Sequence, residues 1–305
     1  MRGATEEFGR LRVIDSRLFS EDGRAVQLYG MSTHGIAWFS KYVCRETFTF
    51  LKEQWGINCV RLALYTFEYN GYCTGGDKEQ LYKTVLNGVK LGFELGMYVI
   101  VDWHVLNERD PLLYMDEAVR FFERISKECA PLGNVIYEIC NEPNTDARWE
   151  DITKYAETVI PVIRKNDPKS VILVGTPRWS QEIDKACCAP LEFENIMYTL
   201  HFYAATHKDH LRQELIRALD AGTPVFISEF GICDSMGSGS LDYEQGAKWR
   251  ELIEDRGLSF ICWNISDHRE SAAILHHGCP ALSGWDDDDL SEHGVWIRDW
   301  FLDKK

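Results

Sequence analysis

Eight short apolar segments recur along the chain, separated by longer stretches of mixed polarity. β-Branched and aromatic side chains are frequent in them, and apolar residues follow one another without strict alternation. Such continuous runs are typical of strands covered on both faces, as in a parallel sheet. The eight predicted strands cover residues 26–33, 59–65, 98–104, 135–141, 171–176, 196–202, 224–230 and 259–266.

Amphipathic segments with a helical spacing of apolar residues lie between these strands. Several are followed by a glycine, the residue preferred just after the last turn of a helix. The last segment follows Asp288 and Asp289, and either side chain could cap it. The predicted helices cover residues 45–55, 79–95, 115–130, 149–166, 208–221, 242–256 and 290–301.

Alternating strands and helices in this number predict an α/β fold, a (β/α)8 TIM barrel. A doubly wound sheet is the alternative, but no Gly-x-Gly-x-x-Gly follows any predicted strand. Residues 11–28 predict a β-hairpin, with turns at 15–17 and 21–23, that closes the barrel floor. Because no linker or repeat divides the sequence, we expect residues 1–305 to form one domain, with 1–8 as a flexible N-terminal tail.

The charge balance excludes several classes of partner. The chain carries 33 basic and 48 acidic side chains, a formal net charge of −15, and no basic cluster. Nucleic acids and anionic membranes are therefore poor candidate partners, whereas a neutral substrate would tolerate this charge. No run of about 18 apolar residues predicts a membrane span.

Ten cysteines are many for a chain of 305 residues. Several lie within the predicted strands, where cysteine usually acts as a small buried hydrophobe. No Cys-x-x-Cys pair is present, which argues against a zinc site. We therefore expect mostly free thiols rather than a disulfide framework.

Two glutamates lie at the ends of apolar runs, each just before a turn-forming residue. Glu142 precedes Pro143, and Glu229 lies two residues before Gly231. A buried strand has no structural need for a carboxylate at its exit, because an unpaired buried charge is costly. The carboxyl ends of all barrel strands meet at one rim, so the two side chains should converge. A converging pair of carboxylates is the minimal equipment for cleaving a glycosidic bond.

Polar and aromatic side chains are frequent near the predicted carboxyl end of every strand. Each alone could serve packing, but their coincidence at all eight ends favours a functional site. A guanidinium within an apolar run, as at Arg61, must also find an acidic partner. The residues are His34, Trp38, Arg61, Tyr65, His104, Asn141, Glu142, Trp179, His201, Tyr203, Glu229, Trp263 and Asn264.

Glycoside hydrolysis needs one protonated carboxyl group, which donates to the leaving oxygen, and one ionised carboxylate. Arg61 and a hydroxyl donor such as Tyr203 would keep Glu229 ionised. Glu142, within plausible reach of His201, could hold its proton and afterwards act as a base. The environments of the two glutamates therefore predict two different roles.

Neighbouring side chains would complete the site. Asn141 has a side-chain donor suited to a sugar 2-hydroxyl group, and Trp263 offers an apolar face for a pyranose ring. Glu138 competes with Glu142 for the role of the acid, because both have the same parity along the strand. Glu138 lies about four residues deeper in the barrel, so we assign it to structural pairing.

At these residues the chain resembles glycoside hydrolase family 5, a family of retaining (β/α)8 hydrolases. The resemblance is closest to its bacterial endo-β-1,4-glucanase subfamily. The combination of the run Asn141-Glu142-Pro143 with Glu229 is highly specific. The matching residues span nearly the whole chain: 30–35, Trp38, 60–61, 101–104, 137–143, 201–203, 228–231, 263–267, Glu270, Ser271, Trp285 and 289–294.

The resemblance implies that Glu142 is the acid/base and Glu229 the nucleophile. One departure concerns substrate binding, since His268 stands where this subfamily often has a lysine that bonds a distal glucose. Histidine is shorter than lysine and titrates near neutrality. The resemblance further implies catalytic support from Arg61, His104, Asn141, His201, Tyr203 and Trp263, non-reducing-side subsites at His34, Trp38, Tyr65 and Glu270, and a leaving-group subsite at Trp179.

Residues and resemblance together predict a retaining endo-β-1,4-glucanase that acts through a covalent glycosyl-enzyme intermediate, with no metal or organic cofactor. The same machinery could act on β-mannan, mixed-linkage β-glucan, xyloglucan or xylan. The alternative from another class is a non-catalytic glycan-binding barrel. The run Asp286–Asp289 could hold calcium, although a solvated loop and helix cap is the favoured interpretation.

The expected partner is a β-1,4-glucan polysaccharide or oligosaccharide, bound by a monomer. Polymeric cellulose cannot enter a cell, so we expect an extracellular enzyme, either secreted or displayed. Residues 1–7 contain no apolar segment of the kind found in signal peptides. We therefore expect that a signal was removed from this chain.

Overall fold

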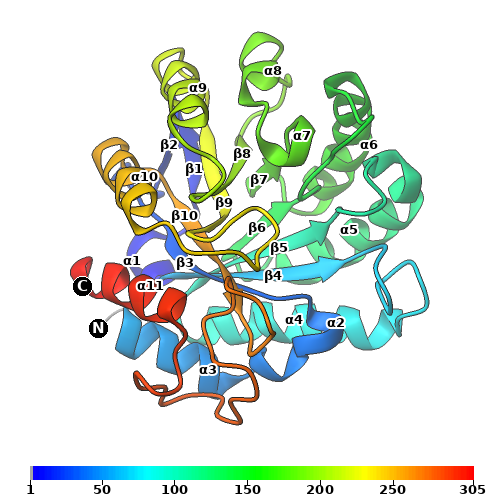
Figure 1. Cartoon of the computed structure of the whole chain (residues 1–305). Coiled ribbons are helices and arrows are strands. Elements are labelled where there is room, and N and C mark those ends of the chain that lie inside the picture. The colour runs from blue at the N-terminus through cyan, green and yellow to red at the C-terminus, as the bar shows by residue number, and fades with distance from the viewer. Residues whose placement is uncertain (1–2) are drawn as a thin grey trace.

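Eight parallel strands form a closed barrel in the computed structural model, which describes residues 3–305 (Figure 1). Each strand pairs with its neighbours in sequence, and β10 closes the barrel against β3. The predicted (β/α)8 architecture is thereby confirmed. The barrel strands are β3 (Tyr29–Thr33), β4 (Cys59–Tyr65), β5 (Tyr98–His104), β6 (Val135–Glu138), β7 (Val171–Val174), β8 (Ile196–Tyr203), β9 (Val225–Gly231) and β10 (Phe260–Ile265).

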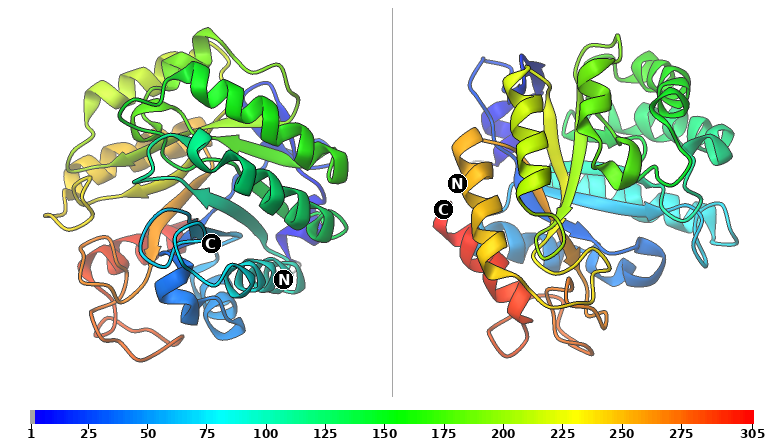
Figure 2. Two further views of the ribbon diagram at one scale, coloured as in Figure 1. Left: turned by 90° about the vertical axis from the view of Figure 1, so that its right-hand side faces the viewer. Right: turned by 45° about the horizontal axis from the view of Figure 1, so that its top comes forward.

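Helices surround the barrel on all sides, as two further views show (Figure 2). All seven predicted helices are present, and α1, α2, α7 and α8 are additional short ones. The α-helices are α1 (Ala4–Phe8), α2 (Ile36–Phe39), α3 (Arg45–Phe50, continued by a π-turn at Leu51–Trp55), α4 (Lys78–Glu94), α5 (Met115–Cys129), α6 (Trp149–Asn166), α7 (Pro177–Ser180), α8 (Ile183–Cys188), α9 (Asp209–Asp220), α10 (Tyr243–Arg256) and α11 (Glu292–Asp303).

Local sequence signals explain where these helices begin and end. The Asp77 carboxylate caps α4 by accepting from the backbone of Glu79 and Gln80. Gly257 ends α10 in the left-handed conformation that glycine adopts without strain. For α11 the predicted cap was wrong. Ser291 caps this helix, because its hydroxyl accepts from the Gly294 N–H. The preceding aspartates instead form hydrogen bonds within their own loop, such as that from the Asp288 N–H to Asp286 Oδ1.

The predicted N-terminal hairpin is present and packs on the floor of the barrel. Strands β1 (Arg12–Ile14) and β2 (Arg17–Phe19) pair antiparallel. Leu18, which is 2% exposed, packs in one apolar cluster with the inward-facing Ile100 and Leu173. Helix α1 lies within the segment expected to be a flexible tail, and Phe8 packs against the same cluster.

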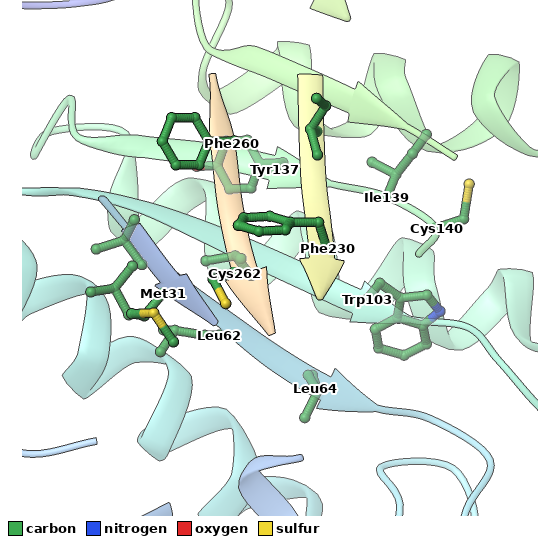
Figure 3. Packing of buried hydrophobic residues seen from close by; sticks show 14 of the residues in the cluster. Met31, Leu62, Leu64, Trp103, Tyr137, Ile139, Cys140, Phe230, Phe260 and Cys262 are labelled. Atoms are coloured by element: carbon green, nitrogen blue, oxygen red, sulfur yellow. The ribbon is translucent and has the colours of Figure 1, made fainter. Parts of the chain in front are cut away.

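A larger apolar core fills the layer between the strands and the helices (Figure 3). Met31, Leu62, Leu64, Trp103 and Phe230 are all fully buried there. Complete burial of such a side chain stabilises a fold by roughly 1.5–3 kcal/mol. This shell keeps the barrel rigid and thereby fixes the strand ends from which the site is built.

Strands β6 and β7 end earlier than the apolar runs predicted. Residues 139–142 leave β6 and cross toward β5, where the Asn141 N–H donates to the Trp103 carbonyl and the Glu142 N–H to the Val105 carbonyl. Gly175 permits this path, because a Cβ there would lie 2.2 Å from the Cys140 carbonyl oxygen. Glu142 therefore sits on a hydrogen-bonded segment over the mouth of the barrel rather than on a strand.

The cysteines agree with the expectation of free thiols. Within residues 3–305, which include all ten, none forms a disulfide, and six are buried. Over the same residues, no helix combines the length and the apolar character that crossing a membrane requires.

Candidate active site

A cleft of about 660 Å³ opens at the carboxyl ends of the barrel strands. Trp38 and His268 lie outside its lining, but their rings contact His34 at centroid distances of 5.8 and 5.4 Å. Arg61 and Asn141 are fully buried beneath the cleft. Asn264 is also fully buried and lies outside the lining, with its Nδ2 donating to Glu270 Oε1 at 2.6 Å. The other predicted site residues line it: His34, Tyr65, His104, Glu142, Trp179, His201, Tyr203, Glu229, Trp263 and Glu270.

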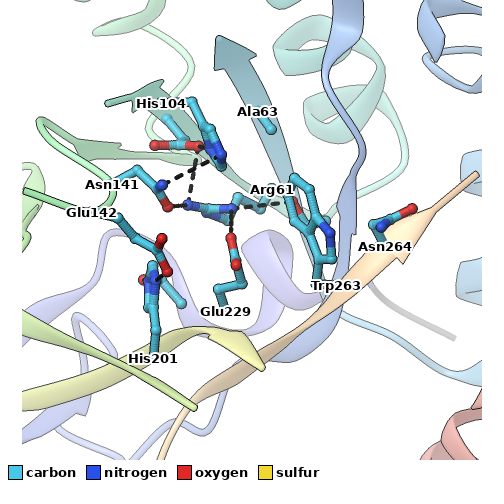
Figure 4. Close-up of polar contacts among 12 residues, drawn as sticks. Arg61, Ala63, His104, Asn141, Glu142, His201, Glu229, Trp263 and Asn264 are labelled. Carbon is cyan, nitrogen blue, oxygen red and sulfur yellow. Dashed lines mark hydrogen bonds and ion pairs between the residues drawn. The ribbon is translucent and has the colours of Figure 1, made fainter. Parts of the chain in front are cut away.

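Arg61 on β4 is the hub of a buried polar network (Figure 4). Its Nε donates to Glu138 Oε2 at 2.6 Å, and Nη1 donates to Glu229 Oε2 at 3.1 Å. Nη2 donates to Asn141 Oδ1 at 2.6 Å and lies 3.0 Å from Asp102 Oδ2. The guanidinium thus finds the acidic partners that a buried cation requires.

Glu229 lies in β9, two residues before its end, and receives two strong donors. Besides Arg61, the Tyr203 hydroxyl donates to Glu229 Oε1 at 2.7 Å. The two donors named from the sequence therefore reach the expected glutamate.

Glu142 has a different environment, and His201 is its hydrogen-bond partner. His201 Nδ1 lies 2.9 Å from Glu142 Oε1. Burial raises the pKa of Glu142 to about 7, and the negative charge of Glu229 acts in the same direction, against the hydrogen bond from His201. A carboxyl group with this pKa carries its proton much of the time near neutrality.

His201 connects Glu142 to the buried Glu138 through a serine. His201 Nε2 lies 2.9 Å from Ser228 Oγ, which donates to Glu138 Oε1 at 2.6 Å. Burial opposes the protonation of His201, but the neighbouring carboxylates of Glu138 and Glu142 outweigh it and raise its pKa to about 9.

Glu138 lies below the cleft in a fully buried ion pair. Burial opposes its ionisation, but Arg61 and His201 outweigh this effect and lower its pKa to about 2. The structure therefore places Glu138 in the structural pairing expected for it, away from the cleft.

Asn141 and His104 occupy the side of Arg61 that faces β5. Asn141 Nδ2 donates to the Val105 carbonyl at 3.1 Å and lies 3.3 Å from His104 Nε2. His104 Nδ1 lies 2.6 Å from Asp102 Oδ2. Burial, followed by the charge of Arg61, lowers the pKa of His104 to about 3, so its ring is neutral.

Aromatic rings form one wall of the cleft. The rings of Tyr65 and His104 lie 4.0 Å apart, and His104 stacks on Trp263 at 5.4 Å. Trp38 extends the wall outward, with its ring 4.9 Å from that of Tyr65. Such a surface suits the apolar faces of successive pyranose rings.

Trp179 reaches the opposite side of the cleft from an unusual turn. Arg178, Trp179 and Ser180 have φ values of 57°, 58° and 53°, so three consecutive non-glycine residues are left-handed. Each such residue costs roughly 1–2 kcal/mol. The turn leaves the Trp179 side chain 41% exposed along the cleft.

Two groups of side chains in residues 3–305 bring three ligand-type atoms within 4.8 Å of one another. They are Glu142, His201 and Glu229, and His34, His268 and Glu270. The first group is the carboxylate pair described above. In the second, His34 Nδ1 accepts from the Gly35 N–H at 2.6 Å. The ring proton of neutral His34 therefore lies on Nε2, the atom 3.8 Å from Glu270, which makes it a donor rather than a ligand.

The run Asp286–Asp289, considered as a calcium site, belongs to neither group. Asp286 Oδ1 accepts from the Asp288 N–H, and Asp289 Oδ2 accepts from the Asp286 N–H. These carboxylates close their own loop, whereas the helix cap expected of them is supplied by Ser291.

Sequence reasoning missed several residues of the lining. Residues 235–237 follow β9, and His207 follows β8, so the rule that loops after barrel strands form the mouth could have found them. Arg178 and Gln181 gave no separate signal, because the turn that presents them has no sequence pattern. The missed residues are Leu106, Asn107, Arg178, Gln181, His207, Ser235, Met236 and Gly237.

A closed (β/α)8 barrel with two differently held carboxyl groups in an aromatic-lined cleft defines a glycoside hydrolase. The family model described as cellulase, glycosyl hydrolase family 5, matches residues 19–269. The chain belongs to this family, which confirms the resemblance found in the sequence.

Known relatives of the chain support the same family assignment. The chain is 45% identical over 295 residues to endoglucanase A of Butyrivibrio fibrisolvens and 40% identical over 299 residues to an endoglucanase of Clostridium saccharobutylicum. These matches cover 96% and 97% of this chain but 68% and 66% of the two relatives. The catalytic domain of Thermobifida fusca endoglucanase Cel5A in complex with cellotetraose superimposes with a TM-score of 0.93 at 35% identity, covering 98% of this chain and 99% of that one.

Proposed function

We propose that the chain is a retaining endo-β-1,4-glucanase that hydrolyses internal bonds of cellulose by double displacement. The observation that carries the proposal is the separation of Glu142 and Glu229, of which one oxygen each lies within 4.8 Å of the other. Retaining enzymes hold their carboxyl groups about 5–5.5 Å apart, whereas inverting enzymes need about 6.5–9.5 Å to admit a water. The close pair favours direct attack by a carboxylate on the sugar.

In the first step Glu229 Oε attacks the anomeric carbon and forms an ester. The glycosidic C–O bond breaks, and the leaving oxygen takes the proton of Glu142 as it keeps the bonding electrons. Arg61 and Tyr203 hold Glu229 in place for attack, with donors at 3.1 and 2.7 Å. Glu142 is suited to the role of acid because its pKa is raised to about 7.

In the second step Glu142 is the base. It takes a proton from water, whose oxygen attacks the anomeric carbon and displaces Glu229 as a free carboxylate. Formation of the ester has by then removed the negative charge of Glu229, which contributes to the raised pKa of Glu142. The pKa of Glu142 therefore falls within the cycle and favours the deprotonated form when a base is needed.

Sugar binding is divided between the two sides of the carboxylate pair. His104, Asn141, His201 and Trp263 would surround the cleaved sugar together with Arg61 and Tyr203. The aromatic wall supports glycone subsites at His34, Trp38, Tyr65, His268 and Glu270, and Trp179 supports the leaving-group side. We expect the enzyme to act as a monomer. A polymeric substrate lies outside the cell, so we place the enzyme there, secreted or displayed.

Two substitutions test the proposal on carboxymethylcellulose. Glu142→Ala should lose at least about 10²-fold in kcat, as expected for a general acid/base. Glu229→Ala should lose about 10⁴-fold or more, as expected for a nucleophile. Asp167→Asn is the matched control, since Asp167 is a buried carboxylate paired with Arg10 before β7, away from the cleft. It should keep wild-type kcat, and near-normal activity of either glutamate variant would contradict the proposal.

Product analysis tests the mechanism and the glycan separately. NMR of early products should show the β-anomer first, and the α-anomer would exclude retention. A panel of cellulose, β-mannan, mixed-linkage β-glucan, xyloglucan and xylan, with product sizing, should show the highest kcat/KM on β-1,4-glucan. If another glycan gave the highest kcat/KM, the proposed mechanism would stand and the proposed substrate would be replaced by that glycan.

A further inference from the structure

Ser180 ends the left-handed turn and makes three hydrogen bonds through its hydroxyl group. The side chain is fully buried. Its Oγ donates to the Asn141 carbonyl at 2.6 Å and accepts from Thr199 Oγ1 at 2.9 Å and from the Thr176 N–H at 3.3 Å. One donor and two acceptor sites are all that a hydroxyl offers, so every one is used.

The same turn contacts the backbone on both sides of Glu142. Ser180 bonds the Asn141 carbonyl, and the Trp179 N–H donates to the Pro143 carbonyl at 3.0 Å. The turn that presents Trp179 therefore hydrogen-bonds the carbonyls of both residues that flank Glu142. The Glu142 N–H, which belongs to the same peptide group as the Asn141 carbonyl, donates to the Val105 carbonyl.

Backbone strain indicates that this arrangement serves the site. Three consecutive left-handed residues persist only where surrounding contacts over-determine them, and such strain clusters at functional sites. Here the contacts that hold the strained residues are the bonds to residues 141 and 143 and to Thr199. A relaxed turn would release those bonds and move Trp179.

We propose that Ser180 is a positioning residue that fixes the leaving-group platform, Trp179, and the acid/base, Glu142, relative to each other. This inference rests on the function proposed above. Sugar leaving groups need both a stacked aglycone and a well-aimed proton. Loss of the Ser180 hydroxyl therefore selectively slows cleavage of bonds whose leaving group must be protonated.

The experiment compares Ser180→Ala with the wild type on two substrates, using kcat/KM, which reports the first chemical step. 2,4-Dinitrophenyl β-cellobioside has a leaving group that needs no acid, whereas cellotetraose needs both the acid and the aglycone platform. Ser170→Ala is the matched control. Ser170 is a buried serine just before β7, as Ser180 is a buried serine after it, and its hydroxyl bonds Asp167 and Arg164.

In Ser180→Ala, kcat/KM on cellotetraose should fall by about ten- to a hundredfold, which is part of the 10²–10⁴-fold that acid catalysis supplies. Its kcat/KM on the aryl substrate should fall by less than about threefold. Ser170→Ala should change both rates by the same small factor. Equal losses of Ser180→Ala on both substrates, or none, would overturn the proposal. A wild type inactive on both substrates would instead overturn the proposed function.

A second variant covers the case in which Ser180→Ala does not fold. Thr199→Val removes the hydroxyl that donates to Ser180 and keeps the shape of the side chain and Ser180 itself. It should show the same selective loss on cellotetraose in weaker form, about three- to tenfold. An unselective change in a folded Thr199→Val would reject the positioning role.

Discussion

At the scale of single residues, the two glutamates differ because their neighbours differ. Glu229 accepts hydrogen bonds from Arg61 and Tyr203. Glu142 is hydrogen-bonded to His201 and lies near the negative charge of Glu229. Arg61 explains much of this asymmetry, since its donors go to Glu229 and Glu138 and none goes to Glu142. The division of roles proposed for the two glutamates would thus follow from the direction of one guanidinium group.

The raised pKa of Glu142 predicts the basic limb of the pH profile. In the proposed mechanism the first step needs protonated Glu142, so kcat/KM on cellotetraose should fall about tenfold per pH unit above pH about 7. Initial rates between pH 5 and about 9 measure this limb. The dinitrophenyl substrate is the control, since it should keep its rate across the same range, and a flat profile on cellotetraose would contradict the assignment.

The same shift predicts a pH-dependent stability of Glu142→Gln. The folded-state pKa of Glu142 is raised from 4.5 to about 7. The wild type therefore loses stability as the pH rises from about 4.5 to about 7. Glutamine cannot ionise and avoids that loss. The variant should gain roughly 1–3 kcal/mol over the wild type at pH 8 relative to pH 4. Urea unfolding at both pH values measures it, and an equal difference at the two would refute the explanation.

At the scale of elements, the hairpin is the part whose structural role can be separated from catalysis. Leu18 packs with the inward-facing residues at the barrel floor, far from the cleft. Leu18→Ala should lower the free energy of unfolding by about 2–5 kcal/mol, as expected for a buried leucine. Urea unfolding provides the measurement, and kcat should stay at the wild-type level.

Arg17→Ala, at the exposed neighbour on the same strand, is the control and should change stability by less than about 0.5 kcal/mol. A large loss of kcat in Leu18→Ala would show that the floor and the cleft are coupled, contrary to this division of roles.

The sequence predicted the elements that have strong periodicity and missed those set by tertiary contacts. All eight strands were found, because buried parallel strands are continuous apolar runs. The early end of β6 was not, since the path of residues 139–142 is fixed by bonds to β5. Helix α7 was missed because a left-handed turn of non-glycine residues contradicts local preference.

The site was predictable to the extent that topology alone brings residues together. The carboxyl ends of barrel strands must meet, so a carboxylate shortly after the fourth strand and one near the end of the seventh converge without further information. The tautomer of His34 and the contact of Ser180 with Asn141 depend on interatomic distances that no pattern encodes.

At the scale of the whole molecule, the net charge of −15 should affect charged and neutral polymers differently. The Debye length falls from about 30 Å at 0.01 M salt to about 8 Å at 0.15 M, which screens repulsion of an anionic chain. We expect kcat/KM on carboxymethylcellulose to rise several-fold over this range and kcat/KM on neutral hydroxyethylcellulose to stay constant. Equal responses of the two polymers would exclude a long-range electrostatic effect.

The unpaired cysteines have a consequence for following the molecule as it unfolds. No disulfide links the ten cysteines of residues 3–305, so a reductant has no cross-link to break there and folding needs no oxidant. Burial raises the pKa of Cys129 and of Cys233 to about 12, and only the thiolate reacts with alkylating reagents. Cys188 is exposed and should be labelled at once, whereas the six buried thiols should react only when the barrel opens. The labelling rates of the individual thiols would therefore report the opening of each region without any added probe.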